Sequence, residues 1–297
     1  MNDLSDGKTI GRTSGLGWAV GYVGGGLCLT LNLLMIQHPA WFHLPAENHW
    51  PVRATFFVVG VWWLIFTLQL LIWVPENRVR ESEAGDISSY RAAWRRMAEC
   101  VGGARRFRKN LLLFLIAYLL YNDAIETVIV IAALFASREL EMGQGEIVTC
   151  FLMIQFVAVL GSLLFGHFAD RWSNKRSLQI ALLVWSAILI WTMFMKSRGE
   201  FWLAGAVIAI VLGGSQSVSR SLFGKMIPAG EAAQHYGFFG LSGKISSAAG
   251  PFLFGLVNEI SGSIRWAIFS LFAVLILGQC LLCIVREPGP GVAEDRN

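Results

Sequence analysis

Two carboxylates lie in the middle of one of the most apolar stretches of the chain. The run from Leu111 to Ala136 reads LLLFLIAYLLYNDAIETVIVIAALFA, and its only charged residues are Asp123 and Glu126. Because they are three residues apart, both acids share one face of a helix. A charge at bilayer depth costs at least a few kcal/mol, and acids kept there often relay protons or bind ions. We predict that Asp123 and Glu126, with Asn122, couple a proton or a solute; a structural hydrogen bond or ion pair between helices is the alternative.

Other polar residues in apolar segments are candidate partners for these acids. Lys244 lies within the apolar run 237–258, where it could neutralise one carboxylate or extend towards the cytoplasmic edge. The pair Gly250 and Pro251 is expected to break the same helix locally, which transporters tolerate at moving or binding segments. Gln216 and Arg220 belong to a polar stripe, SQSVSR, that could line a solute path or join helices by hydrogen bonds.

The composition indicates that these residues are carried by membrane-spanning helices. Of 297 residues, 55% are hydrophobic and 15% charged, and the mean hydropathy is +0.56. Soluble domains carry about 25% charged residues, and a helix needs roughly 20 apolar residues to cross a bilayer. The apolar runs do not alternate in polarity as membrane strands do, so an all-α fold is predicted. The eight predicted spans are 15–36, 52–74, 111–135, 147–169, 178–196, 201–223, 237–258 and 264–285.

The basic residues predict the orientation of these spans. Three quarters of the 24 lysines and arginines fall on one side of the eight-span arrangement, so both termini are expected in the cytoplasm, with the bacterial inner membrane as the location. The segment 75–109 is strongly basic, and RAAWRRMAECVGGARRF could form an amphipathic helix along the headgroups. The predicted organisation is a partial N-terminal bundle of two helices (1–74), a basic cytoplasmic linker (75–109), a six-helix C-terminal bundle (110–286) and a cytoplasmic tail (287–297).

Several function classes are disfavoured by what the sequence lacks. We find no phosphate-binding glycine loop, no nucleophile elbow and no cluster of metal ligands, so no enzyme activity, cofactor or metal is expected. His38, His43 and His49 occur in one predicted external loop, but their spacing does not place them on one helix face. The basic linker borders membrane spans, so nucleic acid is not an expected partner. A membrane-embedded enzyme that uses the two carboxylates is a further rival, although no nucleophile accompanies them.

The stretch GHFADRWSNKRS, residues 166–177, resembles a motif of the major facilitator superfamily. In that family a glycine, three residues, an acidic-basic pair and trailing bases form a charged latch in a cytoplasmic loop. The resemblance implies close helix contact at the glycine, and a gating role for the charges that follow it. The implied gating residues are Gly166, Asp170, Arg171, Lys175 and Arg176, with Arg220 near the same cytoplasmic edge.

Three further stretches resemble the UMF-type branch of this superfamily, which includes the fungal vacuole effluxers. They are SGLGWAVGYVGGGL, YNDAIET, and the segment from GGSQSVSRS to GFFGLSGKISSAAGPFLFG. In that branch the second motif usually reads Tyr-x-Asp-Gly with a following Gln and Thr, whereas this chain has Ala124 and Glu126 at two of those positions. The resemblance covers nearly the whole chain and matches helices five to twelve of a twelve-helix fold.

The resemblance implies a function and also an incomplete fold. The expected function is secondary active transport of a small solute, such as an amino acid or related metabolite, by alternating access in the lipid bilayer. The expected fold is a major facilitator-type bundle with a partial N-terminal half and a complete six-helix C-terminal half. Four helices are then missing before Met1. A truncated, non-transporting remnant, or a subunit that needs a partner chain, is therefore the alternative function.

Overall fold

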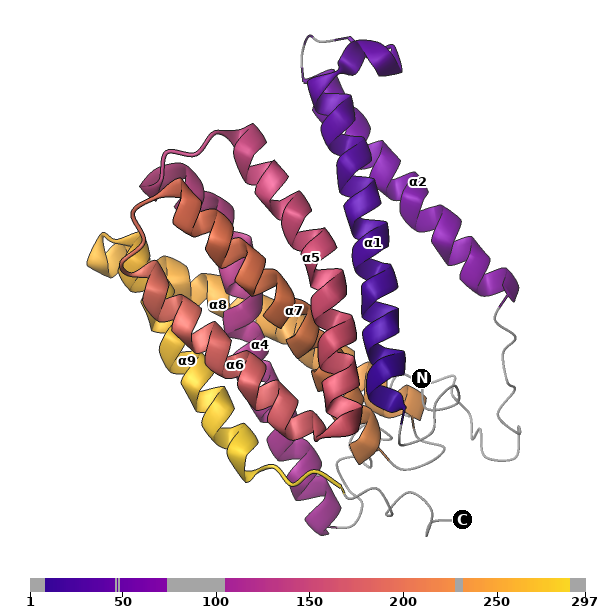
Figure 1. Cartoon of the computed structure of the whole chain (residues 1–297), viewed down its shortest axis with the longest axis vertical. Coiled ribbons are helices and arrows are strands. Elements are labelled where there is room, and N and C mark those ends of the chain that lie inside the picture. Colours follow the sequence, from indigo (N-terminus) through magenta and orange to yellow (C-terminus); the bar gives the residue numbers. More distant parts are fainter. Residues whose placement is uncertain (1–8, 46, 48, 74–104, 228–231, 289–297) are drawn as a thin grey trace, which may run out of the picture. The chain divides into compact units, whose positions relative to one another are not determined.

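The described part of the chain is helical throughout. A computed structural model of the protein describes residues 9–45, 47, 49–73, 105–227 and 232–288, and every regular element within these ranges is a helix (Figure 1). The α-helices are α1 (Ile10–Gln37), α2 (Trp50–Trp73), α4 (Arg105–Glu139), α5 (Gln144–Arg171), α6 (Asn174–Thr192), α7 (Arg198–Met226), α8 (Ala232–Ser261) and α9 (Ile264–Ile284), and η1 (Pro39–Phe42) is a short 3-10 helix. The predicted all-α membrane fold is confirmed.

Each of the eight predicted spans corresponds to one of the long helices. Six of them, α1, α2, α4, α5, α7 and α9, are long and apolar enough to cross a membrane. The helix α6 starts with polar and basic residues, and α8 contains Lys244 and Glu259. The helix α6 also begins and ends earlier than predicted, and its start is fixed by Ser173, which caps the first turn by accepting the N–H of Arg176 at 3.2 Å.

The predicted linker lies mostly outside the described residues. The helix α4 begins at Arg105, so the last residues of the segment 75–109 are helical. The proposed amphipathic helix of that segment cannot be compared with the structure, because residues 74–104 are outside the described ranges. The same holds for the tail beyond Pro288.

The chain divides into two compact units. One contains Met1–Tyr22 and Cys100–Asn297, and the other contains Val23–Glu99. In the second unit, Pro51 is the one buried residue of α2, and large side chains such as Trp63 and Trp73 are exposed. A helix that is apolar on all sides, with most of its large side chains exposed, is typical of a membrane span.

The larger unit is a helical bundle in which α4 is central. The helix α4 packs against α9, α8 and α7, and α5 packs along α7 (Figure 1). Small residues allow these close approaches. A Cβ on Gly161 of α5 would overlap the backbone of Ile210, and one on Gly213 of α7 would overlap the carbonyl oxygen of Ala158. A Cβ on Gly278 of α9 would lie 2.8 Å from the nitrogen of Tyr121, directly before the acidic segment of α4.

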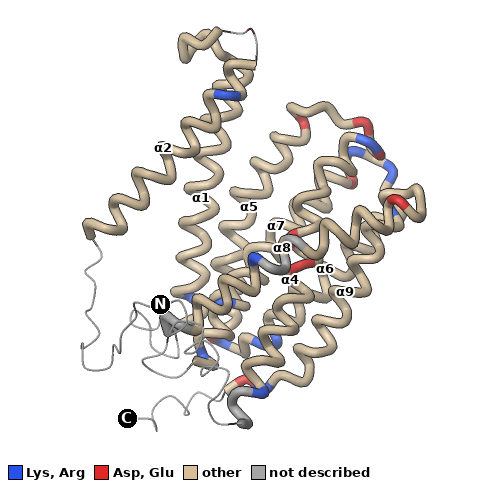
Figure 2. The backbone as a smooth tube through the Cα atoms, turned by 180° about the vertical axis from the view of Figure 1, so that it is seen from behind, with Lys and Arg blue, Asp and Glu red and all other residues tan. Residues whose placement is uncertain are grey.

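The charged residues of this bundle gather towards the ends of the helices, and the acids of α4 are an exception (Figure 2). The packing of α4 against α7, α8 and α9 holds Asp123 and Glu126 inside the bundle. The fold thereby places the two carboxylates between packed helices, away from the ends of α4.

Candidate functional site

Asp123 is bound to the backbone of another helix. Its side chain is 4% exposed, and its Oδ1 accepts the N–H of Gly250 on α8 at 2.6 Å. Gly250 precedes Pro251, the proline inside α8. On α4 itself, the hydroxyl of Thr127 donates to the carbonyl oxygen of Asp123 at 2.7 Å. The carboxylate therefore joins α4 to α8 at the turn where α8 contains its proline.

Glu126 faces a different helix and is less buried. Its Oε1 accepts a hydrogen bond from Nε2 of Gln216 on α7 at 3.1 Å, and its side chain is only partly buried. The hydroxyls of Tyr22 and Tyr118 lie close enough to interact with its charge. The ring of Tyr118 stacks on Phe239 of α8 with the centroids 4.2 Å apart. A carboxylate with one amide donor and aromatic neighbours retains acceptor capacity for a solute or proton.

The remaining predicted coupling residues are placed differently. Asn122 is 3% exposed, beside Asp123 on α4. Lys244 is exposed and, within the described ranges, forms no ion pair with either carboxylate. The partner that the sequence offered for Asp123 by charge is thus replaced by the backbone N–H of Gly250. The structure brings Glu126 and Gln216 together but not Lys244.

The first part of the gating motif contacts the beginning of α1. Asp170 accepts the N–H of Gly11 with Oδ1 and the N–H of Arg12 with Oδ2, both at 2.8 Å. These amides belong to the first turn of α1, whose N–H groups have no partner within the helix and attract negative charge. A Cβ on Gly166 would lie 2.7 Å from the carbonyl oxygen of Gly11 and 3.2 Å from Cα of Gly15. Gly166 therefore permits the close helix contact that the motif implies.

The second part of the motif binds the end of α9. The ammonium of Lys175 donates to the carbonyl oxygens of Cys283 and Val285, both at 2.7 Å. Glu287 accepts the N–H groups of Asn174 at 3.0 Å and Lys175 at 3.2 Å, and also the hydroxyl of Ser173. Each charge thus lies at the helix end whose dipole it complements, with Glu287 at the start of α6 and Lys175 at the end of α9.

The three arginines of the implied gate do not join these clusters. Arg171 and Arg176 have exposed side chains. Arg220 is partly buried on α7, and its guanidinium lies 3.8 Å from where a Cβ on Gly17 of α1 would be. Its backbone carbonyl accepts the hydroxyl of Tyr236 at 3.5 Å. Arg220 therefore lies towards α1, one turn after Gln216, rather than within the motif.

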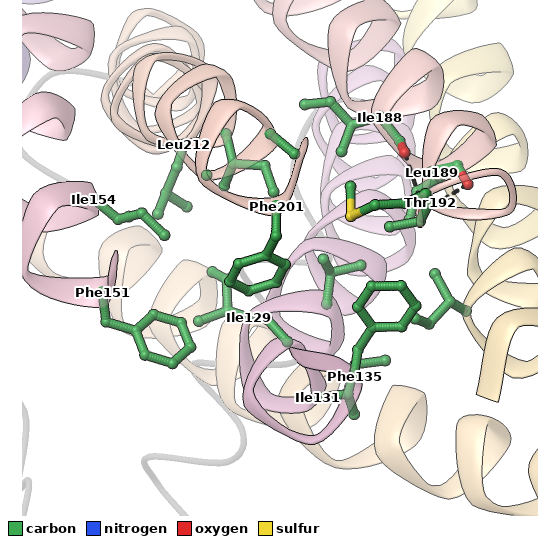
Figure 3. A pocket seen from close by; sticks show the side chains of 17 residues that line it. Ile129, Ile131, Phe135, Phe151, Ile154, Ile188, Leu189, Thr192, Phe201 and Leu212 are labelled. Atoms are coloured by element: carbon green, nitrogen blue, oxygen red, sulfur yellow. Dashed lines mark hydrogen bonds between the residues drawn. The ribbon is translucent and has the colours of Figure 1, made fainter. Parts of the chain in front are cut away.

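The larger unit contains an apolar cavity of about 60 Å³, and Figure 3 shows the side chains that line it. Ile129 follows Glu126 by one turn on α4, and Leu212 precedes Gln216 by one turn on α7; both line the cavity. The polar lining residue, Thr192, uses its hydroxyl to bond the carbonyls of Ile188 and Leu189. The cavity consequently presents hydrocarbon to any occupant. Within the described ranges, no cluster of His, Cys, Asp or Glu is arranged to hold a metal ion.

Comparison with known proteins identifies the family. The family model for Atg22-like vacuole effluxers matches residues 2–288. The chain belongs to the Atg22-like family. This is a family of major facilitator-type transporters and effluxers, not of enzymes, and its members are integral membrane proteins.

Individual relatives agree with this assignment. The chain is 26% identical to an uncharacterised MFS-type transporter, YxiO, of Bacillus subtilis, over 99% of this chain and 68% of YxiO. It is 26% identical to autophagy-related protein 22 of Kluyveromyces lactis, covering 89% of this chain and 56% of that protein. It is 30% identical to autophagy-related protein 22-1 of Aspergillus niger, covering 91% and 46% respectively. The chain thus spans about half the length of its fungal relatives in the Atg22-like family.

Two residues of the site were missed by sequence reasoning. Gly250 was considered only as a helix breaker with Pro251, and its N–H carries no signal in the sequence because almost every residue has one. Glu287 follows the last span and resembles an ordinary charged residue at a membrane edge. The useful signal for it is local, because SNK, residues 173–175, is a helix start that needs an anion.

Proposed function

We propose that this chain carries the C-terminal half, and two helices of the N-terminal half, of a secondary active transporter for a small solute. The substrate class we favour is an amino acid or a related metabolite. The observation that carries the proposal is the pair Asp123 and Glu126, held inside the bundle by hydrogen bonds to an N–H group and an amide rather than by cations.

Two acids inside a helical bundle are suited to the reversible binding of a proton or a cationic group. A charge within membrane helices is costly, so each carboxylate gains from binding a proton or a cationic group. Glu126 is the more accessible acid, and the cavity one turn away is apolar. A polar pair near a cavity of about 60 Å³ suits a solute that has a charged or polar head and only a short apolar portion, because pockets for drug-sized ligands are several times larger. Gln216 would orient Glu126, and Asn122 and Lys244 are secondary members of the coupling site.

The charged latch supports alternating access. Asp170 binds the start of α1, which belongs to the N-terminal half in our domain proposal (1–74), whereas α5 belongs to the C-terminal half (110–286). Secondary transporters of this type expose their site by rocking one half against the other. Release of the two bonds of Asp170 would free the cytoplasmic ends of these halves to separate. The segment 75–109 would connect the halves on the cytoplasmic side of the bacterial inner membrane, where both termini also lie.

The test compares uptake by matched charge-neutral variants. The 297-residue protein is reconstituted into liposomes, and uptake of a mixture of radiolabelled amino acids is measured as a function of external pH. Replacing both acids (Asp123→Asn with Glu126→Gln) should abolish the pH dependence of uptake. The control replaces two exposed acids instead, Glu141→Gln with Glu259→Gln, and should keep it. Unchanged pH dependence in the first variant would contradict the coupling role.

A second function is favoured by two observations. The helix α2 has almost no buried residue, and the chain spans about half of its fungal relatives. The alternative proposal is a subunit or remnant that transports only when four further helices complete the N-terminal half. An antibody against residues 287–297 would measure the size of the protein in its source membranes. A band well above 32.8 kDa favours a longer transporter, and a band at this mass directs the search to a partner chain.

A further inference from the structure

The helix α8 contains a proline where it meets Asp123, although it runs without a break from Ala232 to Ser261, so the local break expected at Gly250 and Pro251 is not found. Pro251 has no N–H, so the carbonyl of Ser247 lacks its usual donor four residues later. One residue before the proline, the N–H of Gly250 is directed to Oδ1 of Asp123 at 2.6 Å, and both groups are buried. At this turn, α8 therefore gives Asp123 a backbone donor, in a part of the helix where the proline has removed one helical hydrogen bond.

A residue larger than glycine at position 250 would force the side chains of Thr127 and Asp123 to move. A Cβ there would overlap the hydroxyl oxygen of Thr127 and lie 2.9 Å from both carboxylate oxygens of Asp123. Other glycines of the same helix show no such requirement, because a Cβ on Gly240 or Gly255 would meet nothing within 4 Å. The close approach is thus confined to the contact between α8 and the acid of α4.

We propose that Asp123 and Gly250 form a proton-sensitive clamp between α4 and α8, in which Gly250 is the positioning residue. The ionised carboxylate holds the N–H of Gly250 and keeps α8 against α4. Binding of a proton to Asp123 converts it to a neutral acid and weakens this hydrogen bond, since charge-assisted bonds are roughly twice as strong as neutral ones. The helix α8 can then pivot at Pro251, away from α4.

The neutral acid has a place for its proton. A protonated carboxyl carries one O–H donor, and the carbonyl of Ser247 is the acceptor that Pro251 leaves without a helical donor. Proton binding therefore exchanges a bond to Gly250 for one to the turn before it. In the proposed clamp, the protonation state of Asp123 selects between two arrangements of α8, one held by the bond to Gly250 and one without it.

In the proposed clamp, Asp123 is the group that binds the proton at the contact between α4 and α8, because the other charged groups lie elsewhere. On α4 the neighbouring acid, Glu126, is bonded to Gln216 of α7. On α8, Lys244 is exposed and is not ion-paired with Asp123 among the described residues. The other acidic and basic residues described on the helices that pack against α4 lie nearer helix ends: Glu146, His167, Asp170 and Arg171 on α5, Arg198, Glu200, Arg220 and Lys225 on α7, His235 and Glu259 on α8, and Arg265 on α9, which pairs with Glu139 at 2.8 Å.

This inference rests on the proposed function and divides the roles of the two acids. Glu126 is partly exposed beside Gln216 and the apolar cavity, where a solute can reach it. Asp123 is buried on the backbone of α8, where it can control the helix but has little surface for a solute. The solute and the conformational change would thus be sensed by different carboxylates one turn apart.

The clamp is tested by measuring the distance between α4 and α8 without any solute. Spin labels are attached to cysteines at two exposed positions, Val130 on α4 and Phe252 on α8, in a chain whose five native cysteines are replaced. Distances are measured by pulsed electron paramagnetic resonance in lipid nanodiscs, in acidic and in mildly alkaline buffer. We expect a longer distance in acid, by roughly 1–2 Å or more, as for helix shifts in other switching proteins.

Matched variants show which residues cause the change in distance. Asp123→Asn is isosteric and permanently neutral, so it should give the acid distance in both buffers, whereas Glu126→Gln should keep the shift. Gly250→Ala should give the longer distance in both buffers, and Gly255→Ala should behave like the parent protein. A shift that survives in Asp123→Asn, or a parent protein with no shift, would overturn the clamp. If Gly250→Ala does not fold, Asp123→Asn decides alone. Uptake is not measured, so this failure is separate from failure of the proposed function.

Discussion

Replacing Gly166 by alanine tests the contact between α5 and the start of α1. A Cβ at this position would lie 2.7 Å from the carbonyl oxygen of Gly11 and 3.2 Å from Cα of Gly15. Both neighbours are backbone atoms, so no side chain can rotate to make room. The added methyl group must push α1 away from α5, and this motion lengthens the two 2.8 Å bonds that Asp170 accepts from α1.

The size of the effect follows from this geometry. Inserting a methyl group into a close-packed contact costs about 1–3 kcal/mol. If the strain is relieved by local opening at the start of α1, amide exchange there should accelerate by roughly 5- to 150-fold. The expected site of the change is the first turns of α1, residues 10–22, because the overlap and the bonds of Asp170 both lie there.

Hydrogen-exchange mass spectrometry of the protein in nanodiscs measures this acceleration directly. The matched control is Gly145→Ala on the same helix, where a Cβ would meet nothing within 4 Å. That variant should change stability by no more than about 1 kcal/mol and leave exchange at residues 10–22 unaltered. Equal exchange at the start of α1 in Gly166→Ala, Gly145→Ala and the parent protein would refute the assignment of Gly166 to this contact.

Three further predictions concern the latch, the C-terminal cluster and the cavity. Asp170→Asn keeps one acceptor for the two amides of α1, so exchange there should rise by the equivalent of about 1–2 kcal/mol; unchanged exchange would contradict the capping role. Glu287→Gln should weaken the start of α6 by about 0.5–2 kcal/mol, measured as faster exchange of its first turn, whereas Glu259→Gln should not. Ala132→Val adds methyl groups at the cavity and should change the free energy of unfolding in detergent by less than about 1.5 kcal/mol, whereas Ala158→Val, at the crossing of α5 and α7, should lose about 1–3 kcal/mol. Equal losses in both alanine variants would refute the cavity.

The helices were predictable from the sequence because each of them coincides with a long run of apolar residues. The position of Asp123 and Glu126 was predictable for the same reason, since a helix of apolar residues leaves few places for a charge. The contacts of the motif were predictable at Gly166 and Asp170, because a residue without a side chain allows a close backbone contact and an anion needs donors. In the structure these neighbours are the backbone and the amides of α1.

The partner of Asp123 was not predictable. A sequence distinguishes residues by their side chains, whereas the group that donates to Asp123 is a backbone N–H, which almost every residue has. Charge alone suggested Lys244 for Asp123, yet Lys244 is exposed. The acid instead binds the N–H of Gly250, because a glycine beside a proline lets two helices meet closely enough for a backbone bond. The contact of Glu287 was not predictable for a related reason, because it depends on where α6 begins relative to the end of α9.

Proton movement driven by a solute is the most direct test of the central claim, that the acids of α4 couple transport to protons. Liposomes that contain the 297-residue protein are loaded with the pH-sensitive dye pyranine, and each of the common amino acids is added outside in turn. The proposed function predicts that at least one of them changes the internal pH, and that the Asp123→Asn, Glu126→Gln variant gives no such change. Uptake of a labelled amino acid by the parent protein without any change of internal pH would contradict proton coupling.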